Sequence, residues 1–282
     1  MQHRTDEVTL SDELAGKYQS FKHTIAELGK LAIAFSGGVD STLLLYVAHD
    51  VLGDNALAIT ARAQMIPARE IREASEFCTE RDIRHVIMDV DALAIDGFSE
   101  NPSNRCYICK TSLFSAILKQ ASELGFSHVA EGTNTSDLGD YRPGLKALSE
   151  LSVESPLLAA GLSKADVRAL SHALGLPTWD KPSYACLASR IPYDQVITVE
   201  KLAAVEAAED MLIEAGFPQV RCRTHGNLAR IEVPPAQRVA LMEAFASSDL
   251  SQRIRAAGFD YVSVDADGYQ SGSLNRTVTQ NQ

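Results

Sequence analysis

The chain has 282 residues, of which 45% are hydrophobic and 22% charged, as in ordinary folded globular proteins, so a collagen-like, coiled-coil or disordered chain is excluded. It carries 26 basic and 37 acidic residues, a net charge of −11, which argues against broad binding to nucleic acid or anionic membranes. No apolar run approaches the roughly 20 residues of a membrane-spanning helix, and residues 1–10 lack the apolar core of a signal peptide, so we expect a cytoplasmic protein without nucleic-acid or membrane partners.

The first half of the chain alternates helical and extended apolar patterns. These patterns predict helices over residues 11–28, 42–51, 67–81 and 107–124, and strands over residues 31–35, 55–61, 85–89 and 128–131. Because crossover helices join parallel strands, this alternation predicts an α/β fold with a doubly wound parallel sheet and helices on both faces.

The second half begins with one more helix of the same kind and then changes character. The segment Ser163–Asp166 is similar to a capping box, and Gly175 ends the helix that it starts. Turn-forming prolines follow, and we place a domain boundary near Pro192. Beyond it the patterns predict helices over 198–215 and 235–245, and strands over 220–224, 228–233 and 261–265. We therefore predict a doubly wound domain over 1–192 and a smaller α+β domain over 193–282, serving substrate binding or oligomerisation.

A glycine-rich loop joins the first predicted strand to the next helix, with the sequence Ser36-Gly-Gly-Val-Asp-Ser41. At such a junction the helix N-terminus presents unbonded N–H groups, and glycines let the backbone curl around an anion. Asp40 would repel phosphate unless Mg²⁺ bridges the two, so it is also a candidate Mg²⁺ ligand. The alternative is a plain glycine turn capped by serine and aspartate. The predicted phosphate-binding residues are Ser36, Gly37, Gly38, Asp40, Ser41 and Thr42.

Two common nucleotide-binding loops are absent from the sequence. It has no G-x-x-x-x-G-K-[ST] loop of kinases and GTPases, and no G-x-G-x-x-G loop of dinucleotide-binding proteins. The S-G-G-x-D-S loop after the first strand instead resembles the PP-loop ATP pyrophosphatases, with their adenine nucleotide α-hydrolase-like fold. The resemblance implies that ATP is split between its α and β phosphates, that AMP is attached to a substrate oxygen, and that a nucleophile then displaces it.

Five cysteines in a chain of this kind favour metal, redox or buried roles over disulfides. Cys106 and Cys109 are three residues apart at a helix start, so both thiolates lie on one helical face. Cys186 lies in a loop-like stretch after the sheet domain, and loops at the carboxyl ends of parallel strands converge on the ligand crevice. We therefore predict that the three thiolates meet beside the ATP site and hold a [4Fe–4S] cluster with one iron open to sulfide.

Other roles for the cysteines remain open at this point. The three could form a zinc site with a fourth ligand, one thiol could itself donate sulfur, or all could be inert. Cys78 lies on the apolar side of its helix, and Cys222 alternates with two arginines along a strand, so we expect both to be buried.

Further segments resemble one branch of the superfamily, the LarE-type ATP-dependent sulfur transferases, from about residue 28 to about residue 275. They are Ala34-Phe-Ser-Gly-Gly-Val-Asp-Ser-Thr42, Glu131-Gly-Thr-Asn134, Asp140-Tyr-Arg-Pro-Gly-Leu-Lys146, Asp166-Val-Arg168, Cys186-Leu-Ala-Ser-Arg-Ile-Pro-Tyr193, Val220-Arg-Cys-Arg223 and Ala229-Arg-Ile-Glu232. The resemblance implies adenylylation of a carboxylate of pyridinium-3,5-biscarboxylic acid mononucleotide and its conversion to a thiocarboxylate. That product leads to the nickel-pincer cofactor of lactate racemase. Some members sacrifice the sulfur of their own cysteine, and the Cys-x-x-Cys at the helix start favours the cluster-bearing branch instead.

The remaining candidate residues would bind the substrate. Arg221 and Arg223 are two apart on a strand and so share a face, which suits a phosphate; a solvated basic face paired to acids is the alternative. Ser189 and Arg190 could orient the substrate carboxylate or cap a loop. The resemblance places Glu209 near the substrate, and a solvated helix charge is the alternative.

Three residues that follow a strand end, Asp137, Asp140 and Arg142, could serve Mg²⁺, phosphate or substrate, or could be turn residues. Lys110 could touch phosphate or lie on the surface. We also expect a homo-oligomer, and sulfide or a sulfur-donor protein as a possible partner. Three other functions compete: a tRNA thiolase, an amide-forming ligase like the NAD and GMP synthetases, and a nucleotide-binding module without catalysis.

Overall fold

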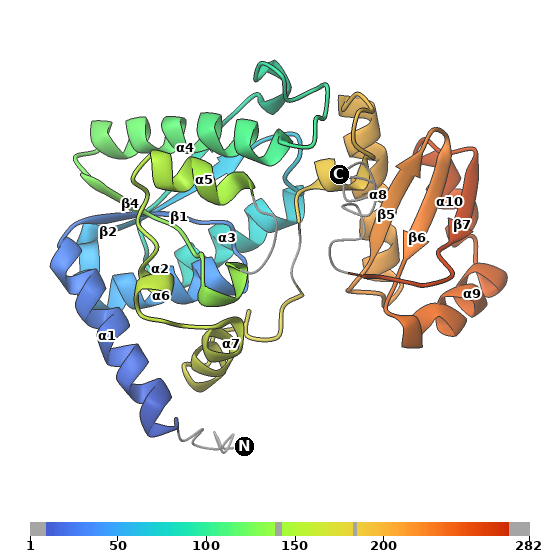
Figure 1. Cartoon of the computed structure of the whole chain (residues 1–282). Coiled ribbons are helices and arrows are strands. Elements are labelled where there is room, and N and C mark those ends of the chain that lie inside the picture. The colour runs from blue at the N-terminus through green and yellow to red at the C-terminus, as the bar shows by residue number, and fades with distance from the viewer. Residues whose placement is uncertain (1–9, 139–142, 183–184, 271–282) are drawn as a thin grey trace. The chain divides into compact units, whose positions relative to one another are not determined.

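The computed structural model describes residues 10–138, 143–182 and 185–270, and the contacts along the chain divide it into two units (Figure 1). The first unit comprises Met1–Ala63, Ala68–Val90 and Cys106–Tyr184, and the second comprises Gln64–Pro67, Asp91–Arg105 and Ala185–Gln282. The turn-forming prolines predicted a domain boundary near Pro192, whereas the contacts place the boundary before Ala185.

The second unit takes in earlier segments because buried side chains tie them to it. The amide of Asn101, which is fully buried, donates hydrogen bonds to the carbonyl oxygens of Ile191 at 3.2 Å, Pro192 at 2.7 Å and Gln195 at 3.2 Å. A side-chain contact across about 90 residues leaves no trace in local composition, so the sequence pattern could not reveal it.

The first unit is built on a four-stranded sheet in which every neighbouring pair is parallel. Its strands are β1 (Leu31–Ala34), β2 (Ala56–Arg62), β3 (His85–Asp89) and β4 (His128–Ala130), in the order β3-β2-β1-β4. Ile33 of β1 lies opposite Ala58 of β2 and Ala130 of β4. The predicted parallel sheet is confirmed.

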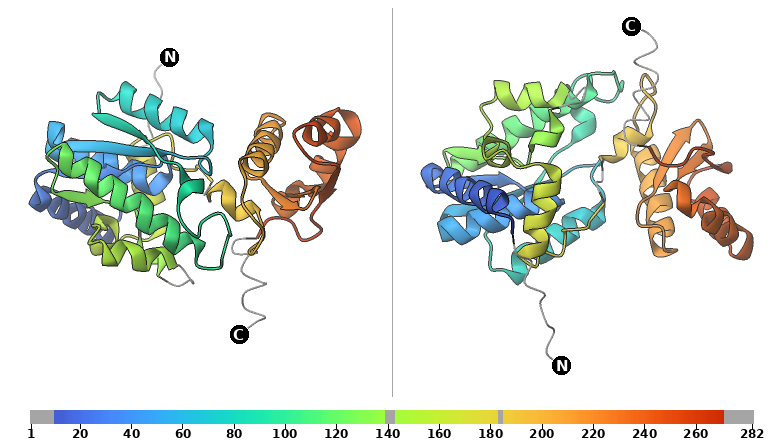
Figure 2. Two further views of the ribbon diagram at one scale, coloured as in Figure 1. Left: turned by 90° about the horizontal axis from the view of Figure 1, so that it is seen from above. Right: turned by 60° about the horizontal axis from the view of Figure 1, so that its bottom comes forward.

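Helices cover both faces of this sheet, because side chains on alternate strand positions enter two separate cores (Figures 1 and 2). Ile33 packs in one core with Leu43 and Leu170, and Leu57 packs in the other with Phe114. The first core is closed by α1 (Asp12–Leu28), α2 (Val39–Leu52), α3 (Ala68–Glu80), α6 (Pro156–Ala159) and α7 (Lys164–Ala173); the second is closed by α4 (Arg105–Glu123) and α5 (Pro143–Glu150). The doubly wound α/β fold predicted from the sequence is therefore present.

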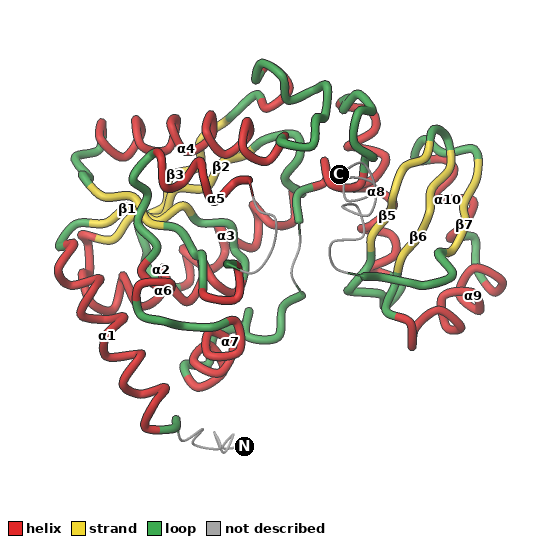
Figure 3. The backbone as a smooth tube through the Cα atoms, viewed as in Figure 1, coloured by secondary structure: helices red, strands yellow, loops and turns green. Residues whose placement is uncertain are grey.

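The second unit is a small α+β unit, as predicted, with a mixed three-stranded sheet (Figure 3). Its elements are α8 (Val199–Glu214), β5 (Arg221–His225), β6 (Leu228–Glu232), α9 (Arg238–Ser247), α10 (Leu250–Ala256) and β7 (Tyr261–Val264). Strands β5 and β6 pair antiparallel across a short hairpin, and β7 pairs parallel with β6 after the two-helix connection. A parallel partner requires such a crossover, which α9 and α10 supply.

Three helices were not predicted from the sequence, namely α5, α6 and α10. They have 8, 4 and 7 residues, and about two turns or fewer are too short for a helical period to stand out. Throughout the described ranges, every helix is too short or too polar to cross a membrane.

Candidate active site

The phosphate loop occupies the predicted place between β1 and α2. Gly38 precedes the first residue of α2 with an extended backbone, φ −80° and ψ 166°, and has no side chain that could occupy the N-terminal amides. Gly37 has a φ of +68°, a conformation that side chains other than glycine rarely adopt. The backbone therefore curls at Gly37 and presents the first amides of α2, the arrangement that binds phosphate.

Three hydroxyls line this turn. The Oγ of Ser36 lies 3.0 Å from the Oγ of Ser41, which is also 3.2 Å from the Gly38 carbonyl oxygen. Thr42 is fully buried, and its Oγ1 has no hydrogen-bond partner within the described ranges. A buried hydroxyl without a partner costs about 1–3 kcal/mol. Phosphate binding by these hydroxyls stays a prediction, as does the alternative of a plain capped turn.

Asp40, the acidic residue of the loop, is neutralised by a residue far along the chain. The Nζ of Lys164 lies 2.5 Å from its Oδ2, and the side-chain amide of Asn134 donates to its Oδ1 at 3.1 Å. Lys164 is the first residue of α7, where the capping box of Ser163 and Asp166 fixes the helix start. The capping box was visible in the sequence, but its proximity to the loop was not. Mg²⁺ binding by Asp40 stays a prediction.

A second lysine contacts the loop itself. The Nζ of Lys181 donates to the Gly37 carbonyl oxygen at 2.9 Å and lies 2.6 Å from Glu73 Oε2. Arg168 of α7 holds the segment that carries this lysine, since its guanidinium donates to the carbonyl oxygens of Trp179 at 2.6 Å and Lys181 at 2.8 Å. Sequence reasoning missed Lys181, which lies 144 residues from its loop partner.

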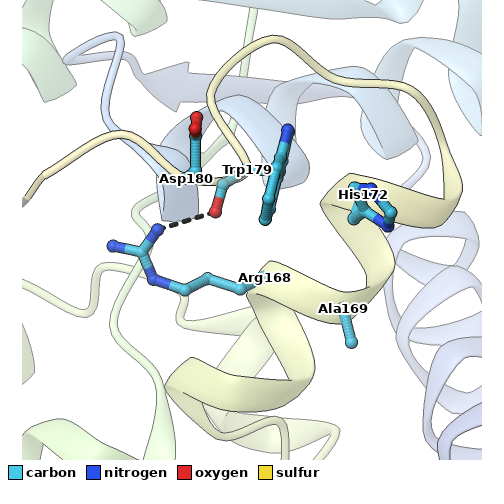
Figure 4. A pocket seen from close by; sticks show the side chains of 5 residues that line it. All are labelled: Arg168, Ala169, His172, Trp179 and Asp180. Atoms are coloured by element: carbon cyan, nitrogen blue, oxygen red, sulfur yellow. Dashed lines mark hydrogen bonds between the residues drawn. The ribbon is translucent and has the colours of Figure 1, made fainter.

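The same segment borders a cavity of about 410 Å³ on α7 (Figure 4). In Figure 4 the indole of Trp179 lies over α7 next to His172. The guanidinium of Arg168 points to the main-chain carbonyl oxygen of Trp179. The rings of Trp179 and His172 have centroids 4.5 Å apart. The cavity is lined by Arg168, Ala169, His172, Trp179 and Asp180. None of these was a predicted site residue, and Arg168 serves here to position the Trp179–Lys181 backbone.

Gly132, just after β4, lets the loop and the neighbouring strand end approach closely. A Cβ at this position would lie 2.9 Å from the Asp40 Cβ and 3.0 Å from the Ser41 N. We expect Gly132→Ala to displace the first turn of α2 and to weaken ATP binding, measured by calorimetry, about ten- to hundredfold, because small misplacements of binding groups are costly. The matched control is Gly16→Ala in α1, where no heavy atom lies within 4 Å of the added Cβ. Wild-type ATP affinity in Gly132→Ala would contradict the prediction.

Four further residues were candidates for binding Mg²⁺, phosphate or substrate, namely Asp137, Asp140, Arg142 and Lys110. The carboxylate of Asp137 accepts the Asn134 N–H at 3.0 Å in a capping box, as a turn residue does, and its Mg²⁺ role stays a prediction. Asp140 and Arg142 lie outside the described residues. The stem of Lys110 packs against Gly144, where an added Cβ would lie 2.7 Å from the Lys110 Cδ.

The five cysteines fall into two classes by burial. Cys78 and Cys222 are buried, as predicted. Burial raises the pKa of the Cys78 thiol to about 12 and also raises the pKa of Cys222, so both stay protonated at neutral pH. Cys106 is exposed and Cys109 partly exposed, and both lie in the first turns of α4.

Cys186 is partly exposed and belongs to the second unit, whereas Cys106 and Cys109 belong to the first. The three thiols are thus divided between the two units, and their meeting beside the ATP site stays a prediction. Inside either unit, the described side chains form no group of three or more His, Cys, Asp or Glu that could hold a metal ion.

Arg190 anchors the segment that contains Cys186. It is fully buried at the end of the 3-10 helix Leu187–Arg190, and its Nε and Nη2 each lie 2.8 Å from a carboxylate oxygen of Glu209. Its Nη1 donates to the carbonyl oxygens of Ala185 at 2.5 Å and Cys186 at 3.1 Å. Glu209 is also fully buried and accepts the Cys222 N–H at 2.9 Å, so the alternative of a solvated helix charge is wrong.

Arg221 and Arg223 lie in the same network on β5, and both are buried, so they form no solvated face; the pairing to acids that belonged to the same alternative is present at Arg223. Arg223 pairs with Glu232 at 3.1 Å and donates to the Ser189 carbonyl oxygen at 2.7 Å. Burial, followed by repulsion from Arg190, lowers the pKa of Arg221 below its ordinary value.

The second unit thus brings together the segment of Cys186 and all the residues predicted for substrate binding except Arg142, which lies outside the described residues. They are Cys186, Ser189, Arg190, Glu209, Arg221 and Arg223. Sequence reasoning missed Glu232, although it ends the Ala229–Glu232 motif and lies in register with Arg221. The binding roles of these residues stay predictions.

Comparison with known proteins places the chain among ATP-using enzymes. No protein-family model matches it. It is 44% identical over 267 residues to an uncharacterised protein of Synechocystis, covering 95% of this chain and all of that protein. It is 37% identical over 270 residues to the pyridinium-3,5-bisthiocarboxylic acid mononucleotide synthase of Lactiplantibacillus plantarum, covering 95% of this chain and 97% of that enzyme. A more distant relative is one component of the glutamine-hydrolysing GMP synthase of Thermoplasma volcanium, 28% identical over 225 residues, covering 73% of this chain and 69% of that protein.

Proposed function

This chain belongs to the LarE-type family of PP-loop ATP pyrophosphatases, and from that premise we propose that it converts a carboxylate of pyridinium-3,5-biscarboxylic acid mononucleotide to a thiocarboxylate at the expense of ATP. The observation that carries the proposal is the match, along 97% of its length, to an enzyme named for the bisthiocarboxylic acid product. The product would serve the biosynthesis of the nickel-pincer cofactor of lactate racemase.

The first step is activation of the substrate. A carboxylate resists nucleophiles because it is an anion with a poor leaving group. One of its oxygens attacks the α-phosphorus of ATP, the bond between the α-phosphorus and the bridging oxygen breaks, and pyrophosphate leaves. The amides at the start of α2 and the ammonium groups of Lys164 and Lys181, which contact the loop, would stabilise the charge that develops on pyrophosphate.

Arg221 and Arg223 would hold the substrate phosphate, and we call this pair the phosphate clamp. Two hydrogen bonds support a position of the clamp close to Cys186, one of the cysteines proposed to deliver sulfur. Arg223 donates to the Ser189 carbonyl oxygen at 2.7 Å, and the Ser189 hydroxyl donates to the Cys186 carbonyl oxygen at 2.8 Å. A mononucleotide held by the clamp would stand beside the backbone of Cys186, so attack by sulfur would become effectively unimolecular.

Sulfur then replaces one carboxylate oxygen: a sulfur nucleophile attacks the activated carbon, and AMP leaves with the original oxygen. Cys106, Cys109 and Cys186 would hold a [4Fe–4S] cluster, and such a cluster, when bound, supplies sulfide. Their accessibility supports this choice of donors, because these three thiols are exposed or partly exposed while Cys78 and Cys222 are buried. Sacrifice of the Cys186 sulfur within the same family is the alternative.

The decisive experiment is anaerobic incubation of the protein with ATP, Mg²⁺ and the dicarboxylated pyridinium mononucleotide, followed by mass analysis of small molecules and protein. We expect AMP, pyrophosphate and a product heavier by about 16 mass units for each oxygen exchanged, with the mass of the protein unchanged. A protein lighter by about one sulfur atom would identify Cys186 as a sacrificial donor. Absence of substrate-dependent pyrophosphate release would contradict the proposed function.

A further inference from the structure

A buried threonine holds the peptide group that leads into the phosphate loop. Ala34, the last residue of β1, lies opposite Ile59 of β2, which places Thr60 level with Phe35. The Phe35 N–H donates to the Ile59 carbonyl oxygen at 2.9 Å, as in a continuing sheet. The Phe35 carbonyl oxygen accepts from the hydroxyl of Thr60 at 2.8 Å, and Thr60 is 2% exposed. A side chain of β2 therefore directs the backbone where the chain leaves the sheet.

The Thr60 hydroxyl is itself held by His85 of β3. The Nε2 of His85 lies 2.8 Å from the Thr60 Oγ1. A hydroxyl has a single proton, and Thr60 donates it to the Phe35 carbonyl oxygen, so Nε2 must carry a proton and donate to Thr60. Burial lowers the pKa of His85, which favours the neutral ring, and the network assigns the proton of that ring to Nε2. The two hydrogen bonds thus form a chain with one direction, from His85 to the Phe35 carbonyl oxygen.

Holding this carbonyl oxygen also sets the direction of the next N–H group. In a planar trans peptide the C=O and N–H bonds point in opposite directions. The Phe35 carbonyl points to Thr60, so the Ser36 N–H points away from β2. It donates to the Ser41 Oγ at 3.4 Å, which is longer than the usual N–H···O distance of about 2.9–3.0 Å. The Ser36 N–H is therefore directed into the loop and bonded there only weakly, so a phosphate oxygen could readily replace the Ser41 Oγ.

We propose that Thr60 is a positioning residue for ATP: through the Phe35 carbonyl it aims the Ser36 N–H at a phosphate oxygen, and His85 holds the Thr60 hydroxyl in the direction that this requires. The assignment deepens the proposed function and rests on its placement of the ATP phosphates at the loop. A donor that is already aimed costs no reorganisation when the anion binds. Neither Thr60 nor His85 belongs to the Ser36–Ser41 motif.

The test measures, by calorimetry with Mg²⁺, the affinity of the intact chain for inorganic pyrophosphate and for α,β-methylene-ATP, which cannot be cleaved between its α and β phosphates. Thr60→Val keeps the shape of the side chain and loses the hydroxyl, whereas Thr60→Ser keeps the hydroxyl. We expect Thr60→Val to bind both probes about tenfold more weakly, and Thr60→Ser to stay within about threefold of the wild type, because a misaligned hydrogen bond to a charged ligand loses much of its strength.

Thr224→Val is the matched control. It makes the same change at a buried position on β5, in the second unit, where the Oγ1 has no hydrogen-bond partner among the described residues. Its affinity for both probes should equal that of the wild type.

Hydrogen exchange at the Ser36 amide, followed by NMR, examines the same contact without a substitution and decides the question if Thr60→Val does not fold. We expect α,β-methylene-ATP to slow this exchange about tenfold or more in the wild type. Unchanged exchange, wild-type affinity in a folded Thr60→Val, or equal losses in Thr60→Val and Thr60→Ser would each overturn the assignment. These measurements need neither the pyridinium substrate nor sulfur. A wild type that binds the probes as expected and transfers no sulfur would contradict the proposed reaction alone.

Discussion

Cys186→Ala is expected to lower sulfur transfer about a thousandfold or more while leaving substrate-dependent pyrophosphate release intact. The reason is that activation and sulfur delivery use different groups. Pyrophosphate release depends on the loop at α2, in the first unit, whereas Cys186 lies at the start of a 3-10 helix in the second unit. The two activities are measured in one anaerobic reaction, by pyrophosphate assay and by mass analysis of the product.

Cys78→Ala is the matched control for this experiment. Cys78 lies on the buried face of α3 and is 1% exposed, and burial raises its pKa to about 12, so it offers no thiolate. Its loss should leave sulfur transfer at the wild-type level. If Cys186→Ala transfers sulfur as fast as Cys78→Ala does, then neither a three-thiol cluster nor a sacrificial Cys186 can be correct.

The fold of the first unit was predictable because its signals are local. Each strand over residues 31–130 is a short apolar run between helices long enough to show their period, and the capping box at Ser163 marks the start of α7. The division of the chain was not predictable to the same degree. The segment that contains Asn101 lies in the second unit because of the hydrogen bonds from its buried amide, and such contacts depend on the completed fold.

The site shows the same contrast between local and distant information. The phosphate loop was predictable because strand, glycines and helix start are contiguous. Lys164 and Lys181 reach that loop from 124 and 144 residues away, so no spacing rule indicates them. Arg190 was expected to orient a substrate carboxylate or to cap a loop, and in the structure it pairs with Glu209 and caps the carbonyl oxygens of Ala185 and Cys186. The sequence singled out these charged residues, but it did not indicate that Arg190 pairs with Glu209 or that Arg223 pairs with Glu232.

The pairing of Arg190 with Glu209 leads to the largest expected effect on stability. Both side chains are 0% exposed, and removing one partner leaves the other as an uncompensated buried charge. We expect Glu209→Ala to lower the free energy of unfolding by about 3–5 kcal/mol, measured by urea denaturation. The Cys222 N–H loses its acceptor at the same time, which adds to the loss. Glu214→Ala, at the exposed end of the same helix, is the control and should change the free energy of unfolding by only about 0.5 kcal/mol or less.

A double variant distinguishes two roles of the Arg190–Glu209 pair, stabilising the fold and positioning the Cys186 segment. Replacing a buried ion pair by apolar residues of similar volume is often neutral or stabilising, so Arg190→Met with Glu209→Leu should recover much of the stability lost in Glu209→Ala. It cannot recover the two hydrogen bonds from Arg190 to the carbonyl oxygens of Ala185 and Cys186. Sulfur transfer should therefore stay low in a folded double variant, while ATP binding at the loop of the first unit stays normal. A stable double variant with wild-type sulfur transfer would show that the pair only supports the fold, and that the Cys186 segment holds its position without it.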